Sequence, residues 1–238
     1  MTIAENVAAV REKIAAAAAR AGRDPSEITL VAASKMNDAQ RVREAIAAGV
    51  DACGENRVQE LLEKNAQGAY EGAALHFIGH LQKNKVKFVV GTAELIHGVD
   101  SVALLEAIDR TAAARGLVQD VLLEINIAAE PSKSGFAAEE LPAALIRASR
   151  LKNLRVRGLM AVPPICVCGE ENLQYFERMR QLFVDNCEKK YDNVRMDFMS
   201  MGMSGDYEAA IACGANMVRI GTAIFGERHY PEKQITGG

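Results

Sequence analysis

Apolar residues recur along the chain with two alternating periods, about two residues as in a strand and about 3.6 residues as in a helix. A helical face begins with Ile3, Val7 and Val10, and the apolar run Ile28–Ser34 that follows predicts a buried strand. The alternation continues through almost the whole sequence without a linker-like break. It predicts eight strands, at Ile28–Ser34, Val50–Cys53, Leu75–Ile78, Leu95–His97, Asp120–Asn126, Val156–Met160, Met196–Ser200 and Asn216–Ile220.

Helices are expected before the first strand and after each strand. The segment Ala39–Ala48 is closed by Gly49, and Ser101 caps a helix that runs to Arg115. A short helical turn is expected after Thr222. The other predicted helices lie at Thr2–Ala21, after Asn56 to about Asn65, and at Gln82–Val90, Ala138–Arg150, Glu170–Lys189 and Tyr207–Cys213.

This order of elements predicts the fold. Eight strands, each followed by a helix, are typical of a single (β/α)8 TIM barrel of the α/β class, here with an extra N-terminal helix. The 238 residues are close to the roughly 250 residues of that fold. A doubly wound open sheet is the alternative, which the count of eight disfavours. We expect one domain over residues 1–230 and a flexible tail over 231–238.

Composition excludes several classes of partner. The net charge of −3 and the pI near 5.9 lack the concentrated basic charge of a nucleic-acid-binding protein. Nothing resembles a signal peptide, and no apolar run approaches the roughly 20 residues that span a bilayer. We therefore expect a cytoplasmic protein that binds neither nucleic acid nor membranes.

Cysteine and histidine spacing offers little support for a disulfide scaffold or a metal site. The five cysteines are an odd number and are widely scattered. Cys166 and Cys168 form a C-x-C pair, which is a weak zinc motif without a second cluster, so two ordinary loop thiols are expected. His76 and His80 are four residues apart, but the zinc motif requires that spacing on a helix. We expect one core histidine and one loop histidine.

Lys35 is the first residue that suggests chemistry. It follows the apolar strand Ile28–Ser34, where a lysine is costly to bury unless it has a task. At the carboxyl end of a barrel strand its amine would point into the pocket where α/β proteins bind their ligands. The alternative is that Lys35 caps the strand in solvent.

The last two predicted strands end in segments rich in small residues, Met199–Ser204 and Val218–Ala223. In barrels, the loops after strands seven and eight often bind phosphate, and here Ser200 and Thr222 would add hydroxyl donors to the backbone amides. The alternative is that these are ordinary loop residues. Arg219 lies within an apolar strand and needs an acceptor, either a structural carboxylate or a ligand.

Ser204 belongs to a sequence that resembles a nucleophile elbow, Gly202-Met203-Ser204, but Asp206 stands where that motif has glycine. We therefore expect Ser204 to be the N-cap of the next helix, with Asp206 in its first turn.

A lysine on the first strand, a phosphate cradle after the last two and an arginine on the eighth together suggest pyridoxal phosphate. Seven segments, in order and spanning nearly the whole chain, match one known family: Leu30–Lys35, Gly54–Asn56, His76–Lys85, Lys133–Phe136, Arg157–Met160, Met201–Asp206 and Val218–Gly226. With them the sequence resembles the YggS/PROSC family of pyridoxal-phosphate-binding proteins, which is related in fold to the N-terminal barrel of alanine racemase.

The resemblance implies a barrel of pyridoxal phosphate fold type III and a role for each matching residue. Lys35 would hold the cofactor as an internal aldimine, Arg219 would face the pyridine nitrogen, and Asn56 would line the cofactor. Contacts with the phosphate are implied for Ser200, Gly221 and Thr222.

Holding the cofactor does not imply a reaction. Racemisation needs acid/base groups on both faces of the cofactor, and the resemblance implies that alanine racemase supplies the second from another domain across a dimer. We expect this chain to end with its barrel and to be a monomer. Arg219, always cationic, would also keep the pyridine nitrogen unprotonated and weaken it as an electron sink.

The resemblance thus implies a binding protein of pyridoxal phosphate homeostasis rather than an enzyme. It would store, buffer or deliver the cofactor, with pyridoxal-phosphate-dependent apo-enzymes as its partners, and so affect amino-acid and keto-acid balance. A weak amino-acid racemase that uses Lys35 is the alternative. A Schiff-base aldolase ranks last, because it explains neither Arg219 nor the matching segments.

Overall fold

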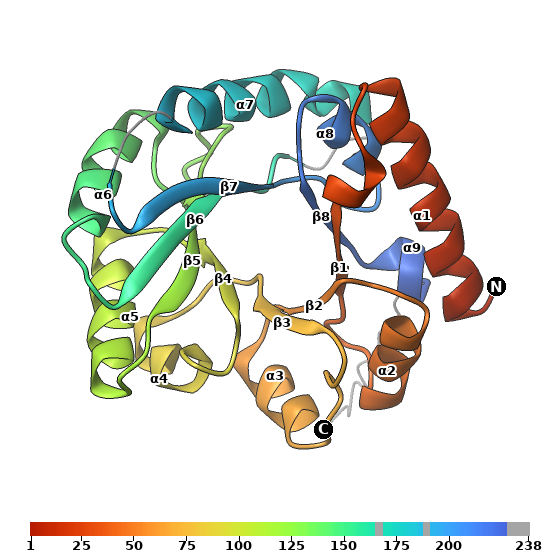
Figure 1. The fold of residues 1–238 in the computed structure, drawn as a ribbon, viewed down its shortest axis with the longest axis horizontal. Helices are drawn as coiled ribbons and strands as arrows, with labels where there is room; N and C mark the ends of the chain where they lie inside the picture. The colour runs from red at the N-terminus through yellow and green to blue at the C-terminus, as the bar shows by residue number, and fades with distance from the viewer. Residues whose placement is uncertain (165–168, 188–190, 228–238) are drawn as a thin grey trace, which may run out of the picture.

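The computed structural model describes residues 1–164, 169–187 and 191–227. Parallel strands pair in chain order, and β1 also pairs with β8, so the sheet closes into a barrel with helices outside it (Figure 1). The predicted TIM barrel is confirmed. Its strands are β1 (Thr29–Ala33), β2 (Ala52–Glu55), β3 (Ala74–Phe77), β4 (Leu95–Val99), β5 (Gln119–Ile125), β6 (Leu154–Ala161), β7 (Val194–Ser200) and β8 (Met217–Ile220).

The helices follow the predicted order with some different bounds. The predicted helix Gln82–Val90 is a 3-10 turn followed by one α-helical turn, and strand β2 continues two residues beyond its predicted end. The helices are α1 (Ile3–Arg20), α2 (Ala39–Ala47), α3 (Val58–Asn65), α4 (Val86–Val89), α5 (Val102–Ala114), α6 (Leu141–Ala148), α7 (Leu173–Cys187), α8 (Tyr207–Ala212) and α9 (Thr222–Phe225), with 3-10 turns at Pro25–Glu27, Lys83–Lys85, Ala138–Glu140 and Gly169–Asn172.

Two predictions fall on residues outside the described ranges. Cys166 and Cys168, expected to be loop thiols, belong to that undescribed part of the chain, as does the tail expected over 231–238. Within the described ranges, no helix combines the length and the apolar character that a bilayer crossing requires.

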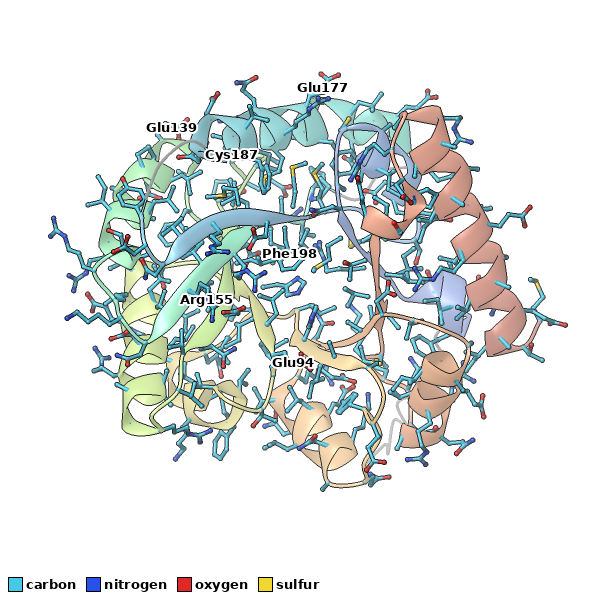
Figure 2. The ribbon with its side chains drawn as sticks, viewed as in Figure 1. Glu94, Glu139, Arg155, Glu177, Cys187 and Phe198 are labelled. Atoms are coloured by element: carbon cyan, nitrogen blue, oxygen red, sulfur yellow. The ribbon has the colours of Figure 1, made fainter. Side chains whose placement is uncertain are left out.

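Alternating strand residues build two apolar layers. Successive side chains of a strand point to opposite faces, so Val31 lies inside the barrel while its neighbours Leu30 and Ala32 pack outward against helices. Figure 2 shows side chains, including the labelled Phe198 of β7, within the ring of strands. The buried interior cluster consists of Val31, Ala52, Leu95, Leu122, Met160 and Met217.

The amino ends of the strands close one mouth of the barrel with charged side chains. Arg157 of β6 forms ion pairs of 2.6 Å with Asp120 of β5 and with Asp197 of β7. Its guanidinium also lies 5.0 Å from the centre of the Phe198 ring. A ligand site is therefore expected at the opposite mouth, where the strands have their carboxyl ends.

The extra N-terminal helix is confirmed as α1, which packs against α2, α8 and α9 (Figure 1). Thr2 and Glu5 form a capping box at its start, with each side chain accepting from the other residue's backbone amide. The Asn6 amide donates to the Ile224 carbonyl at 2.8 Å. Helix α1 thus supports α9, the short helix that directly follows the predicted phosphate segment.

Candidate functional site

Strand alternation turns the predicted site residues toward the barrel interior. Arg219 of β8 is in register with the interior residue Val31 of β1, and Lys35 is an even number of residues beyond Val31. Asn56 is likewise an even number of residues beyond the interior residue Ala52 of β2. These side chains therefore come from the carboxyl ends of three neighbouring strands.

The structure brings Lys35, Gly221 and Thr222 into one pocket of about 530 Å³. Lys35 is half-buried in it. Arg41 of α2 also lines the pocket and donates to the carbonyl of Phe225, which joins α2 to the end of α9. A lysine amine and the segment after β8 thus share one cavity, as the sequence predicts.

Lys35 sits in a tight turn. The amide of Asn37 donates to the Ser34 carbonyl at 3.1 Å, and the Asn37 side chain donates to the Lys35 carbonyl at 3.1 Å. Lys35 and Met36 are the two central residues, and Met36 has φ 63°, a left-handed conformation usual for glycine or asparagine. The turn ends the strand abruptly, so the sequence after Lys35 leaves the barrel and enters α2.

Arg219 is buried in the interior and is held by neutral acceptors. Its Nη1 donates to the Ser200 hydroxyl at 2.5 Å, and its Nη2 donates to the Ala161 carbonyl at 2.9 Å. Burial lowers the pKa of Arg219 to about 10, while the charges of Glu124 and Asp206 act in the opposite direction, so Arg219 stays cationic at neutral pH. Among the described residues, no carboxylate forms a salt bridge with it.

Ser200 belongs to a buried chain of hydrogen bonds and does not line the pocket of Lys35. Its hydroxyl also contacts Nδ1 of His97 at 3.1 Å, and Nε2 of His97 contacts Nδ1 of His76 at 3.1 Å. Donation can run from Arg219 through Ser200 and His97 to His76, which gives each of these ring nitrogens a partner while both imidazoles stay neutral. We call these four residues the interior chain.

Both histidines of the interior chain are held neutral. Burial lowers the pKa of His76 to about 4, and burial, with His76 and Arg219 nearby, lowers the pKa of His97 well below its usual range. His76 is a core histidine as expected, and the exposed His80 is a loop histidine that pairs with Asp100 at 3.0 Å. His97 is not among the residues predicted from the sequence, although it shares the face of the interior residue Leu95.

The prediction for Ser204 is wrong. Helix α8 has Asp206 as its N-cap, and the Ser204 hydroxyl instead accepts from the amides of Gly221 and Ala223 at 3.3 and 3.4 Å. The Asp206 carboxylate accepts from the Met203 amide at 2.6 Å. The loop after β7 therefore crosses to the segment after β8 and places a hydroxyl on two of its amides.

Asn56 lies in a second pocket, of about 270 Å³, with His80, Glu124 and Lys133 among its lining residues. Its Oδ1 atom is buried and has no hydrogen-bond partner within the described part of the chain. Gly79 is required beside it, because a Cβ there would lie 2.3 Å from the Asn56 carbonyl oxygen. The structure thus does not bring Asn56 into the pocket of Lys35, but it leaves a buried acceptor available to a donor.

Metal-ligating side chains do not gather into a cluster in the part of the chain that the structure describes. No group of three or more histidine, cysteine or acidic side chains there could hold an ion. Cys53 and Cys213 are buried free thiols. The donor set that remains consists of a lysine amine, a buried guanidinium, hydroxyls and backbone amides, which fits a phosphorylated aldehyde with a ring nitrogen.

Comparison with known proteins identifies the family of this chain. Residues 6–229 match the family model described as alanine racemase, N-terminal domain. The pyridoxal phosphate homeostasis protein of Pseudomonas aeruginosa is 43% identical over 229 residues, covering 96% of this chain and 97% of that protein.

Solved structures give the same result. The structure of PipY from Synechococcus elongatus with pyridoxal phosphate bound is 33% identical, with a TM-score of 0.81, and the match covers 94% of this chain and 100% of that chain. Alanine racemase of Clostridium difficile in complex with cycloserine is similar in fold, with 17% identity and a TM-score of 0.67, over 87% of this chain and 56% of that chain. The chain belongs to the family of the alanine racemase N-terminal domain, together with the pyridoxal phosphate homeostasis proteins.

Proposed function

We propose that this protein binds pyridoxal 5′-phosphate and acts in the homeostasis of that cofactor, by storing, buffering or delivering it. The observation that carries the proposal is the single pocket lined by Lys35, Gly221 and Thr222. The PipY structure, a full-length match, contains the cofactor. Changes in the supply of the cofactor would in turn affect amino-acid and keto-acid balance.

Each residue of the site has a proposed task. The Lys35 amine would bond to the aldehyde carbon with loss of water. The backbone amides of Gly221 and Thr222, with the hydroxyls of Thr222 and Ser204, would hold the phosphate. Arg219 would face the ring nitrogen. When bound, pyridoxal phosphate supplies an electrophilic aldehyde and a ring that can accept electrons.

Two further residues complete the proposed site. Ser200 would act on the cofactor through Arg219, whose guanidinium it accepts from at 2.5 Å. Asn56 would line the cofactor with its buried side-chain oxygen, which has no partner among the described residues.

The proposal assigns a binding role and no turnover. Relatives at 43% identity are named homeostasis proteins. Arg219 is cationic at neutral pH, so a ring nitrogen beside it would stay unprotonated and the ring would be a weak electron sink. We further propose that the protein works in the cytoplasm as a monomer and hands the cofactor to apo-enzymes.

The test is an absorbance spectrum of the purified protein, before and after borohydride, with mass mapping of the reduced adduct. We expect a yellow protein whose band disappears on reduction and a pyridoxyl group on Lys35. Lys35→Ala is expected to fold and to lose the adduct, because Gly221 and Thr222 lie on another strand end. A protein that stays colourless with added cofactor would remove the proposal and favour the aldolase.

The same preparation tests the absence of turnover. We expect L-alanine and L-serine to keep their configuration when incubated over many cofactor equivalents. Racemisation that is lost in Lys35→Ala would establish the weak racemase instead.

A further inference from the structure

Helix α3 holds the backbone on both sides of Lys35. The Met36 amide donates to Oε2 of Glu60 at 2.6 Å, and Nζ of Lys64 donates to the Ser34 carbonyl at 2.8 Å. Glu60 and Lys64 are one turn apart on α3, at the spacing that puts both on one face. Two charged side chains of a single helix therefore bind the residues directly before and after the candidate lysine.

Lys64 is anchored independently of this contact. Its ammonium forms an ion pair of 2.7 Å with Oε1 of Glu55, and it lies 3.5 Å from Oε2 of Glu60. With the Ser34 carbonyl, these partners use the three donors of an ammonium group. The side chain of Lys64 is 7% exposed and that of Glu55 is fully buried, so the anchor is rigid and shielded from water.

Glu55 is fixed in turn by hydroxyl donors. Its Oε1 atom accepts from the Ser34 hydroxyl at 2.6 Å and from the Tyr70 hydroxyl at 3.0 Å. Glu55 and its neighbour Cys53 are on the outward face of β2, in the layer between barrel and helices. Ser34 is thus held through both its hydroxyl and its carbonyl. We call Ser34, Glu55, Lys64 and Tyr70 the outer cluster.

The contact with Met36 needs an explanation beyond packing. Met36 is 44% exposed, so its amide could bond to water, and its φ of 63° is unfavourable for a residue with a side chain. A strained turn persists only where the surroundings determine it, and the Glu60 carboxylate on the Met36 amide supplies that restraint. The strain is located one residue after Lys35, in the turn that carries the candidate lysine.

We propose that Glu60, held by Lys64, is a positioning residue for Lys35, and that it directs the amine into the pocket of Gly221 and Thr222. The inference rests on the proposed function, since it concerns the bond between Lys35 and the cofactor. Without Glu60 the Met36 amide can relax, and the Lys35 amine spends less time in the pocket. The covalent linkage weakens, whereas phosphate binding by the segment after β8 stays unchanged.

The experiment compares four variants in the full-length protein: Glu60→Ala, Glu60→Gln, Lys35→Ala and Glu60→Ala with Lys35→Ala. Affinity for pyridoxal phosphate is measured by fluorescence titration, and the linkage by the fraction of Lys35 that borohydride traps. We expect Glu60→Ala to bind about tenfold more weakly and to be trapped less, since a charge-assisted hydrogen bond is lost. Glu60→Gln keeps an acceptor for the Met36 amide. We expect it to recover most of the affinity and most of the fraction of Lys35 that borohydride traps.

The Lys35→Ala background separates positioning from general structure. There, adding Glu60→Ala is expected to leave the affinity within about twofold, since no amine remains to be positioned. Glu63→Ala, an exposed residue of the same helix, is the control for substitution on α3. An unchanged Glu60→Ala, or an equal loss of affinity with and without Lys35, would overturn the inference. A wild-type protein that takes up no cofactor would instead overturn the proposed function and this inference with it.

Discussion

The interior chain and the outer cluster are both buried and polar, but only the outer cluster pairs its positive charge with a carboxylate. The outer cluster places an ammonium and a carboxylate in direct contact at 2.7 Å. The interior chain contains one cation, Arg219, bonded to a hydroxyl and a carbonyl, with two neutral imidazoles beyond it. The first arrangement neutralises a charge within the cluster, whereas the second holds a buried positive charge on neutral acceptors, without an ion pair among the described residues.

This difference follows from where each set of side chains points. Residues on the outward face of a strand meet a helix, and helix α3 offers Lys64 to Glu55. Residues on the inward face meet only other strand ends, so the acceptors available to Arg219 come from β7 and β6. We therefore expect the outer cluster to determine the stability of the fold and the interior chain to determine the properties of the site.

The largest expected effect comes from breaking the ion pair of the outer cluster. Lys64→Met leaves the Glu55 carboxylate buried without its cation, and we expect a loss of about 3–5 kcal/mol in the free energy of unfolding. Urea denaturation measures this loss. The double variant Glu55→Gln with Lys64→Met should recover most of it, because no unpaired charge remains buried. A single variant within about 1 kcal/mol of the wild type would contradict the structural role.

The outer cluster also shows what could not be predicted from the sequence. The strands were predictable because alternation along each strand is local, and eight of them imply a closed barrel. Lys64 has the sequence context of any surface lysine on a helix, and only tertiary packing against Glu55 buries it. The outward-facing Glu55 could have been noticed, since a carboxylate at such a position of a barrel strand needs a partner.

The site residues divide along the same line. Lys35, Gly221 and Thr222 share a pocket because the carboxyl ends of parallel strands converge on one mouth of the barrel. Their closeness could be predicted, since the sequence places each of them directly after a strand. The contact of Ser204 with the amides after β8 joins two loops, and no local spacing encodes it. The N-cap rule therefore selected Ser204 where the structure uses Asp206.

The second expected effect is a loss of folding stability at low pH, which originates in His76 of the interior chain. In the unfolded chain a histidine takes up its proton near pH 6.5, whereas the folded protein lowers the pKa of His76 to about 4. Between these values the unfolded state binds more protons, so stability falls as the pH falls through this range. The shift of His76 corresponds to about 3 kcal/mol once the pH is near 4.

Urea denaturation at several pH values measures this dependence. His76→Asn should reduce the difference in stability between pH 7 and pH 4 by an amount of that order. His80→Asn is the matched control, because His80 is 57% exposed and lies outside the interior chain. If both variants showed the slope of the wild-type protein, His76 would not be the group that titrates.

The smallest expected effect on stability distinguishes the two serines near the segment after β8. Ser200→Ala leaves Nη1 of buried Arg219 without its 2.5 Å acceptor, and we expect a loss of about 1–3 kcal/mol in the free energy of unfolding. Ser204→Ala removes only two long hydrogen bonds, of 3.3 and 3.4 Å, and should cost about 0.5 kcal/mol.

Titration with the cofactor then distinguishes the two serine variants by the position of the absorbance band and by the binding affinity. Ser200→Ala should shift the absorbance band of the bound cofactor, because it disturbs the Arg219 guanidinium, which we propose to face the ring nitrogen. Ser204→Ala should keep the band position and weaken binding of the phosphate, since its hydroxyl lies on the amides of Gly221 and Ala223. The opposite assignment, with the band moved by Ser204→Ala and affinity lost in Ser200→Ala, would place Ser200 at the phosphate, as the family resemblance implies, and would remove it from the control of Arg219.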